Sequence, residues 1–359
     1  MSTAILNSAK RLDANAALDL FVNEDLLVLG ALAEEVKAEF HSPDAPYTFV
    51  IDRNLNYTNI CNVDCMFCAF YRHKEDSDAY TLDYDSEIKP RIQELADANG
   101  TQLLLQGGVN PDLPFEYYPD LIQKIRRDFP NITIHAFSPT EIAFMVELTG
   151  WPLKTVLEKL IDAGISSIPG AGAEILHDDV RKKVSPKKVD SLGWLDVMEA
   201  AHEVGLKTSA TMMFGMTEKP EHIVDHLMRI RELQDKTGGF TAFIPWTFQA
   251  QNTRLEKLAT LATGVDYLRV LALSRIILDN VVNIQSSWIT QGQKICQTGL
   301  FFGANDAGGL LLEENVVTAA GIKAEVMPVA EMVKLIHGTG RDAAQRDTQY
   351  KILKQYPRI

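Results

Sequence analysis

The sequence predicts an α/β fold, a (β/α)8 barrel of the TIM type preceded by a helical extension. From about residue 47 onward, short runs rich in β-branched and aromatic residues alternate with amphipathic helical segments. Alternation of this kind indicates parallel strands joined by helical crossovers. The chain of 359 residues is also long enough for one such barrel, which commonly takes ~250 residues.

Eight runs have strand character, and the last of them is the weakest. They cover residues 49–59, 101–108, 132–138, 165–170, 207–215, 240–248, 282–290 and 299–305. The helical segments between them are 86–100, 115–129, 152–164, 192–205, 220–236 and 265–280. Several of these segments end at a glycine, as is common at a helix C-terminus. A six-stranded partial barrel with extensions is the alternative that the weak last run leaves open.

The same patterns divide the chain into three units. Residues 1–46 are expected to form a helical extension, with Asp13 as an N-cap and apolar residues at helical spacing. The proline-containing stretch HSPDAP ends it. Residues 47–325 are expected to hold the barrel, and residues 326–359 a helical segment packed on it.

Composition and charge exclude several classes of function. Apolar residues make up 46% of the chain, which is enough for a large core. The net charge is -13, and an acidic chain repels phosphate backbones, so nucleic acid is a poor partner. No apolar run approaches the ~20 residues that a membrane helix needs, and the N-terminus lacks a secretory pattern. We therefore expect a cytoplasmic protein whose thiols stay reduced, with no membrane and no nucleic-acid partner.

Three of the four cysteines, Cys61, Cys65 and Cys68, lie within eight residues, directly after the first strand. Barrels of this type place their active sites at the C-terminal ends of the strands. Clustered thiols in a reduced compartment indicate a metal or iron–sulfur centre. Three thiolates on a four-iron cluster leave one iron without a protein ligand. The alternatives are a structural zinc site completed by His73, a four-cysteine cluster that recruits Cys296, and scattered buried cysteines.

The spacing C-x3-C-x2-C, with Phe67 before the third cysteine, resembles the signature of the radical S-adenosylmethionine (SAM) enzymes. The resemblance implies a [4Fe-4S] cluster held by three cysteines and SAM as co-substrate, which binds the open iron and yields a 5′-deoxyadenosyl radical. It also implies a reducing electron donor of the flavodoxin or ferredoxin type.

A narrower resemblance spans residues 50–321 and points to the cyclic dehypoxanthinyl futalosine synthases of the futalosine route to menaquinone. The segments that carry it most clearly are NYTNIC, CAFYR, QGGVNPDLP and SSWITQG. The implied reaction takes a hydrogen atom from the ribose C4′ of dehypoxanthinyl futalosine and adds the sugar radical to the benzoate ring. Aminofutalosine synthases and deazaflavin (FO) synthases are the sister alternatives. An iron–sulfur electron carrier is the alternative from another class.

The resemblance also assigns residues. Many relatives place a Gly-Gly-Glu turn after the second strand, and this chain has Gln106-Gly107-Gly108 there, without the acid. The implied SAM-binding set is Gln106, Gly107, Gly108, Ser138, Glu174, Lys188, Thr211 and Met213. The implied substrate-binding set is Arg72, Trp246, Trp288 and Asp306. Asp306, Glu174 and His135 are the expected catalytic residues.

Each assignment has a plainer alternative. Glu174 also suits a helix start, and Arg181, Lys187 and Lys188 also suit a solvated basic face. His135 and the two tryptophans also suit core packing. Asp306 also suits a turn in its glycine-rich loop. The sequence indicates neither the oligomeric state nor the residue that accepts the final proton.

Overall fold

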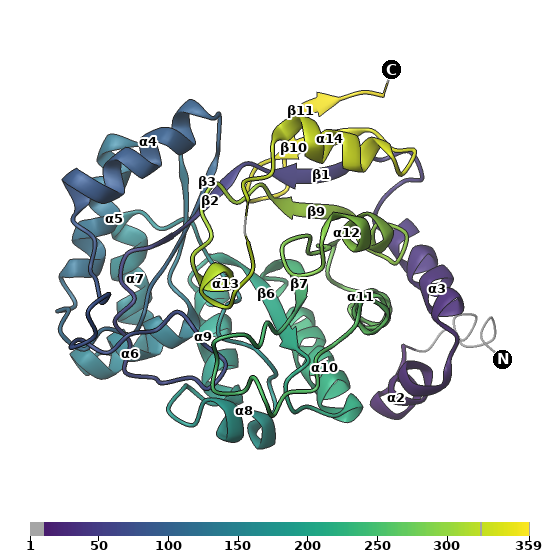
Figure 1. Cartoon of the computed structure of the whole chain (residues 1–359), viewed down its shortest axis with the longest axis horizontal. Coiled ribbons are helices and arrows are strands. Elements are labelled where there is room, and N and C mark those ends of the chain that lie inside the picture. Colours follow the sequence, from purple (N-terminus) through teal and green to yellow (C-terminus); the bar gives the residue numbers. More distant parts are fainter. Residues whose placement is uncertain (1–10, 324, 359) are drawn as a thin grey trace.

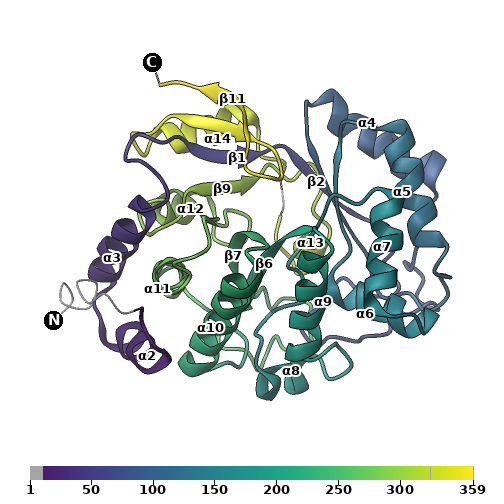
Figure 2. The ribbon, with the colours of Figure 1, turned by 180° about the vertical axis from the view of Figure 1, so that it is seen from behind.

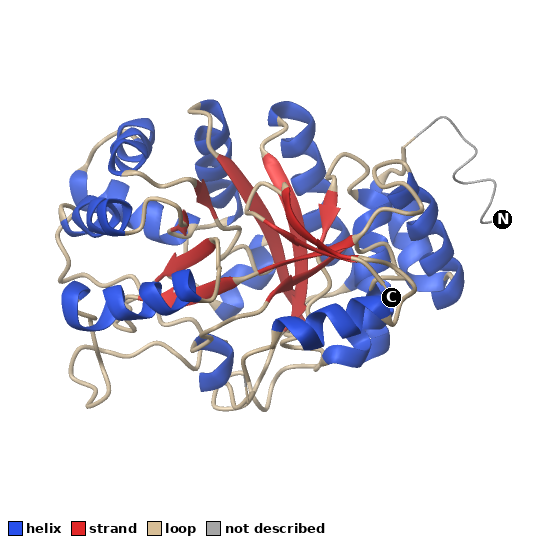
Figure 3. Ribbon diagram, turned by 90° about the horizontal axis from the view of Figure 1, so that it is seen from above, coloured by secondary structure: helices blue, strands red, loops and turns tan. Residues whose placement is uncertain are grey.

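The computed structural model describes residues 11–323 and 325–358. Seven parallel strands form one curled sheet whose order follows the sequence. Seen from above, these strands gather at the centre of the molecule with helices around them (Figure 3). The strands are β2 (Asp52–Asn56), β3 (Gln102–Gln106), β4 (Thr133–Ala136), β5 (Ser167–Ile168), β6 (Lys207–Phe214), β7 (Phe240–Thr247) and β8 (Asn283–Ile284).

Helices cross over between consecutive strands on the outside of the sheet, and α4, α5 and α7 lie together on one flank (Figure 1). Figure 2 shows α9 and α10 outside β6, which both helices contact. The helices are η1 (Tyr84–Ile88, a π-helix), α4 (Lys89–Asp97), α5 (Tyr117–Asp128), α6 (Pro139–Thr149), α7 (Leu153–Ala163), α8 (Asp178–Val184), α9 (Ser191–Glu203), α10 (Pro220–Thr237), α11 (Gly264–Ile277), α12 (Gln293–Gly299) and α13 (Val316–Ala319).

An eighth strand, β9 (Asp306–Gly309), runs between the two ends of the curled sheet. On one side it pairs in parallel with β1 (Tyr47–Val50), which continues into β2 after one residue. On the other side the Ser286 amide donates to the Asp306 carbonyl at 2.8 Å. The barrel prediction is therefore confirmed, with eight strand positions and not six.

The eighth strand was predicted in the wrong place. The stretch 299–305 contains the buried residues Leu300 and Phe302, but it forms the end of α12 and a turn. The true strand is the sequence DAGG. Glycine and aspartate have low strand propensity, so position between two neighbouring strands decides the conformation here.

The ends of the chain pack on the barrel flanks. Asp13 caps α2 (Ala14–Asn23) by accepting a hydrogen bond from the Ala16 amide, as predicted, and α3 (Leu26–Ala38) packs against α11. Residues 1–10 of the predicted extension lie outside the described residues. No helix in the described part of the chain has the length and apolar character needed to cross a membrane.

The C-terminal segment is not purely helical, which corrects the prediction for residues 326–359. Helix α14 (Val329–His337) is followed by β10 (Ala343–Arg346) and β11 (Ile352–Tyr356). Strand β10 pairs in parallel with β1 and antiparallel with β11, which extends the sheet beyond the barrel. Four of the five residues of β11 are exposed, so its sequence lacks the apolar alternation that would have revealed it.

Candidate active site

A cavity of about 430 Å³ lies inside the barrel and opens toward the C-terminal ends of the strands. Side chains alternate between the two faces of a strand, so every second residue of β2, β3 and β6 lines it. These residues are Asp52, Asn54, Asn56, Gln102, Leu104, Gln106, Ser209, Thr211 and Met213. Seven of these nine strand residues are polar, whereas bulky apolar residues usually fill a barrel core.

The three clustered cysteines all line this cavity. Backbone bonds hold their loop in place: the Cys61 amide donates to the Arg72 carbonyl at 2.9 Å, and the Met66 amide donates to the Val184 carbonyl at 2.8 Å. Burial raises the pKa of all three thiols, that of Cys65 to about 12. Thiolates at this depth therefore need a cationic centre such as iron to stabilise them.

A structural zinc site or a four-cysteine cluster would need a fourth protein ligand beside the three thiols. The predicted fourth ligands are engaged elsewhere: His73 bonds to Asp64 at 2.7 Å, and Cys296 is fully buried next to the Ser286 carbonyl.

The turn Gln106-Gly107-Gly108 begins at the last residue of β3 and lies against the cysteine loop at Ile60 and Cys61. A Cβ on Gly108 would lie 2.1 Å from the Ile60 carbonyl oxygen, and a Cβ on Gly107 would lie 2.6 Å from the Tyr57 ring. Only glycine permits the backbone of the turn to lie this close to the Ile60 backbone and to the Tyr57 ring. Gln106 Nε2 is buried in the cavity wall without a hydrogen-bond partner, as is Thr140 Oγ1 nearby, so both atoms are available to a ligand.

Glu174 and Lys188 form an ion pair in the cavity wall, with 7% and 10% of their side chains exposed. The ammonium of Lys188 also lies 5.0 Å from the centroid of the Phe67 ring, within the cysteine loop. Burial disfavours the charged lysine, but the negative charges of Glu174 and Cys65 together outweigh this effect and raise the pKa of Lys188 overall. This pair can hold both a carboxylate and hydroxyl groups of a bound nucleoside.

The other two basic residues of this segment have different roles. Arg181 is buried and donates to the carbonyls of Gly172 and Ala173, at 3.2 and 2.5 Å, which shapes the loop that carries Glu174. Lys187 is exposed and pairs with Asp64. Lys188 is therefore the one member of the predicted basic cluster that faces the cavity.

The remaining predicted residues that reach the cavity are His135, Ser138, Thr211, Met213, Trp246 and Trp288. His135 bonds through Nδ1 to Ser167 Oγ at 2.7 Å, and burial lowers its pKa to about 3, so the ring is neutral. Trp288 donates to the Gly309 carbonyl at 2.8 Å, which fixes the indole in the wall.

Two protein-family models match this chain. The radical SAM superfamily model matches residues 55–230, and the model of the CofH/MqnC C-terminal region matches residues 237–358. The cyclic dehypoxanthine futalosine synthase of Halalkalibacterium halodurans is 42% identical over 97% of this chain and 93% of its own length. The chain is a radical SAM protein of the CofH/MqnC family.

The chain is also similar in sequence to an enzyme with another name, and similar in fold to a solved structure. The 5-amino-6-(D-ribitylamino)uracil–L-tyrosine 4-hydroxyphenyl transferase of Archaeoglobus fulgidus is 40% identical over 90% of this chain and 92% of its own length. The crystal structure of methylornithine synthase (PylB) has a TM-score of 0.72 at 16% identity, covering 95% of this chain and 96% of its own. That likeness supports the radical SAM barrel alone.

Two predicted site residues do not reach the cavity of this radical SAM barrel. Asp306 is not in a glycine-rich loop but in β9, fully buried, and four donors fill its carboxylate: Arg346 Nε (2.6 Å) and Nη2 (2.9 Å), Thr48 Oγ1 (2.5 Å) and the Gly308 amide (2.9 Å). Arg72 points away, because it pairs with Asp78 at 2.7 Å and donates to three nearby carbonyls. Neither side chain is among those that line the cavity.

Four charged residues of the cavity wall are absent from the predicted site residues: Asp52, Glu141, Glu314 and Arg346. Glu141 was noted only for its place after the third strand, beside His135 and Ser138. Burial raises the pKa of Asp52 to about 6, and the Leu311 amide donates to it at 3.0 Å. The alternating polar residues of DRNLN were a usable signal for Asp52, and the capping-box pattern Ser138-x-x-Glu141 was one for α6 and Glu141. Arg346 gave no such signal, because it comes from the unpredicted strand β10.

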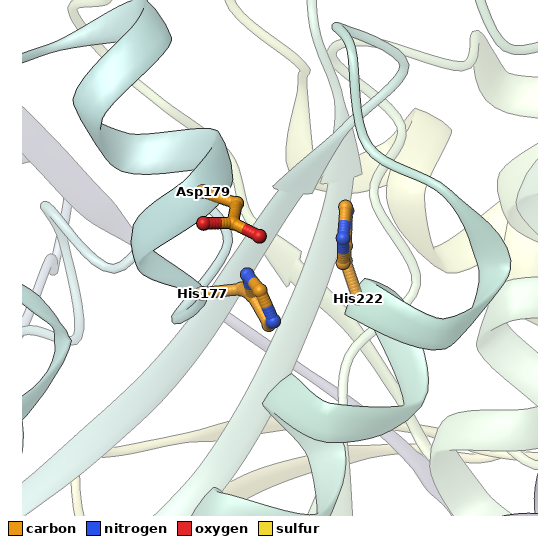
Figure 4. Close-up of side chains that lie close together, drawn as sticks. All are labelled: His177, Asp179 and His222. Atoms are coloured by element: carbon orange, nitrogen blue, oxygen red, sulfur yellow. The ribbon is translucent and has the colours of Figure 1, made fainter.

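A second polar cluster, His177, Asp179 and His222, lies outside the cavity where α8 and α10 begin (Figure 4). The two imidazole rings are 4.3 Å apart between centroids. The Lys219 amide already donates to His222 Nδ1 at 3.1 Å, so the other nitrogen of the neutral ring carries the hydrogen and cannot bind a metal. The cluster is therefore a packing contact between two helix starts.

Proposed function

We propose that this radical SAM protein is a cyclase that converts dehypoxanthinyl futalosine to its cyclic form in menaquinone biosynthesis. The observation that carries the proposal is the single cavity that brings together the three cysteines, the Gln106–Gly108 turn and the Glu174–Lys188 pair. The relatives at 40–42% identity over nearly the whole chain that are named cyclic dehypoxanthine futalosine synthase support the choice of substrate.

The chemistry balances without a second organic substrate. When bound, the reduced cluster and SAM supply a 5′-deoxyadenosyl radical together with methionine. The substrate loses the hydrogen atom of its ribose C4′, and C4′ then forms a bond to a carbon of the benzoate ring. The cyclised radical loses one electron and one proton, which restores aromaticity and leaves a spirocyclic product. The electron released in this last step balances the one used to cleave SAM, so the overall reaction needs no net reductant.

Within this proposal different cavity residues bind the cluster and SAM. Cys61, Cys65 and Cys68 would hold the cluster. Gln106 and Thr140 offer unpartnered polar atoms for SAM, and the Glu174–Lys188 pair offers a carboxylate to hydroxyl groups and an ammonium to a carboxylate.

The apolar and neutral part of the wall would surround the reacting atoms. Trp246 and Trp288 supply flat apolar surfaces for the benzoate ring. His135 stays neutral and suits hydrogen bonding to the sugar more than proton transfer.

We also propose a cytoplasmic location and reduction by a flavodoxin or ferredoxin. The clustered free thiols require a reducing compartment. The cysteine loop lies at the open end of the barrel, where a small electron carrier can approach it. We also propose that the chain divides into three units, residues 1–46, 47–325 and 326–359.

The decisive experiment uses the anaerobically reconstituted protein with dithionite and SAM. Dehypoxanthinyl futalosine alone should yield cyclic product and 5′-deoxyadenosine in equal amounts. The transferase branch, favoured by the Archaeoglobus relative, would instead require tyrosine and 5-amino-6-(D-ribitylamino)uracil. Turnover with that pair and none with dehypoxanthinyl futalosine would reject the cyclase. Absence of 5′-deoxyadenosine with every substrate would reject radical chemistry altogether.

A further inference from the structure

Glu141 is a buried carboxylate in the cavity wall that the proposed reaction does not use. It stands in the first turn of α6, with 3% of its surface exposed. Its Oε1 accepts hydrogen bonds from the Tyr57 hydroxyl at 2.7 Å and from the Gly107 amide at 3.0 Å. Its Oε2 accepts from the amide and the hydroxyl of Ser138, both at 2.7 Å.

Only half of these contacts belong to helix capping. In a capping box the acid bonds back to the N-cap residue, here Ser138. Helix α11 has a capping box of the same kind, in which the Asp266 carboxylate bonds only to Thr263. The bonds from Tyr57 and Gly107 are therefore an addition that helix formation does not require.

The additional bonds connect two parts of the active site. Tyr57 directly follows β2, the strand that leads into the cysteine loop, and Gly107 directly follows β3. The Gly108 amide donates to the Thr58 carbonyl at 2.9 Å, so the turn is fixed from both sides. Glu141 thereby sets the orientation of the Gly107 peptide group.

All four acceptor positions of this carboxylate are occupied, so it has no free position for a direct bond to a ligand. Its charge still acts over the short distance into the cavity. Among the described residues no lysine, arginine or histidine pairs with Glu141 at 4.0 Å or less. A buried carboxylate without a cation is costly unless a ligand brings the positive charge.

We propose that Glu141 is a positioning residue for the ammonium end of SAM. It supplies, from α6, the negative charge that the Gln106–Gly108 turn lacks, and it holds Gly107 in the orientation that the ligand needs. This inference rests on the proposed function, because it takes SAM as the occupant of the cavity.

The test compares two ligands and two variants by equilibrium dialysis on the anaerobically reconstituted protein. The ligands are SAM and an analogue of SAM without the α-amino group. Glu141→Gln keeps the size and removes the charge, and Asp266→Asn is the matched control in a capping box remote from the cavity. We expect E141Q to raise the Kd of SAM about tenfold, an effect of about 1.4 kcal/mol, and to change the Kd of the analogue less than about twofold. Iron content should stay that of the wild type.

An equal loss of affinity for both ligands, or no loss, would overturn the role of Glu141. If E141Q does not fold, Glu141→Asp tests the hold on Gly107, since aspartate keeps the charge and serves as the capping acid of α11 but would not reach Gly107. Weaker binding of SAM with unchanged binding of the analogue supports the proposal, and unchanged binding of SAM rejects it. Failure of the wild-type protein to bind SAM would reject the proposed function itself.

Discussion

Gly108→Ala should displace the cysteine loop while leaving the fold intact. The added Cβ would lie 2.1 Å from the Ile60 carbonyl oxygen and 2.9 Å from Cys61 Cβ. To restore an ordinary contact of 3.4 Å, the Ile60 carbonyl has to retreat by about 1.3 Å. Cys61 is the next residue, so the first thiolate of the cluster moves with it.

Neither backbone can yield freely. The Gly108 amide is bonded to the Thr58 carbonyl at 2.9 Å, and the Cys61 amide to the Arg72 carbonyl at 2.9 Å. Overpacking of this kind costs about 1–3 kcal/mol of folding free energy, so the barrel should still fold. A ligand set needs placement within about 0.5 Å, and a displacement of about 1.3 Å exceeds that.

The assay is the iron and sulfide content of the reconstituted protein, followed by 5′-deoxyadenosine formation per folded chain. We expect G108A to lose at least about half of its iron and about 100-fold in rate. Gly205→Ala is the control, since its Cβ meets no atom within 4 Å and its positive φ of 89° costs stability alone. Wild-type iron content in G108A would refute this account of the turn.

Three further outcomes are expected. Lys188→Met leaves Glu174 unpaired in the cavity wall and should lower the free energy of unfolding by about 3–5 kcal/mol in urea titrations, most of which K188M combined with Glu174→Gln should recover. Asp306→Asn weakens the buried pair with Arg346, so it should lower the melting temperature yet keep the 5′-deoxyadenosine rate per folded chain within about threefold. A complete loss of that rate would show that Asp306 is catalytic after all. The pKa of His135 is about 3 in the fold against about 6.5 unfolded, so at this residue the unfolded chain alone takes up a proton as the pH falls below 6.5. His135 should therefore contribute about 2 kcal/mol to the loss of stability between pH 7 and 5, and His135→Gln should lose less stability than the wild type by about that amount.

The barrel could be predicted because its strands and helices are local patterns. Seven of the eight strand runs overlap observed strands, since buried parallel strands read as apolar runs between helices. Strand β9 was not predicted because its sequence DAGG has no such pattern, and its conformation depends on the strands on either side. Strand β10 was missed because its sequence AAQR has no apolar run, although it lies buried between β1 and β11. Strand β11 was missed because it is an exposed edge strand without hydrophobic alternation.

The active site could be predicted where the chemistry is local in sequence. The cysteines and the glycines of the turn lie in short segments after a strand, which places them at the cavity in any such barrel. The roles of Arg72 and Asp306 could not be predicted from their position after a strand. In the folded chain Arg72 pairs with the neighbouring Asp78, and Asp306 pairs with the distant Arg346. Ion pairs between remote segments become visible only in the folded chain.

The charge of the cavity predicts the order in which the proposed ligands bind. Its wall holds four carboxyl groups and two cations: Asp52, Glu141, Glu174, Glu314, Lys188 and Arg346. Both cations are already paired, and burial raises the pKa of three of the acids. An anionic benzoate should therefore bind weakly to the cavity until a cation has entered it.

SAM brings that cation, so its binding should strengthen the binding of the substrate. By linkage the substrate must strengthen the binding of SAM by the same factor, and a coupling of about 1–3 kcal/mol is typical. Calorimetric titration of dehypoxanthinyl futalosine with and without SAM, on reconstituted but unreduced protein, measures this factor directly. Equal affinities in the two titrations would mean that the acidic groups of the wall are neutral or screened, and that the charge of the cavity does not set the binding order.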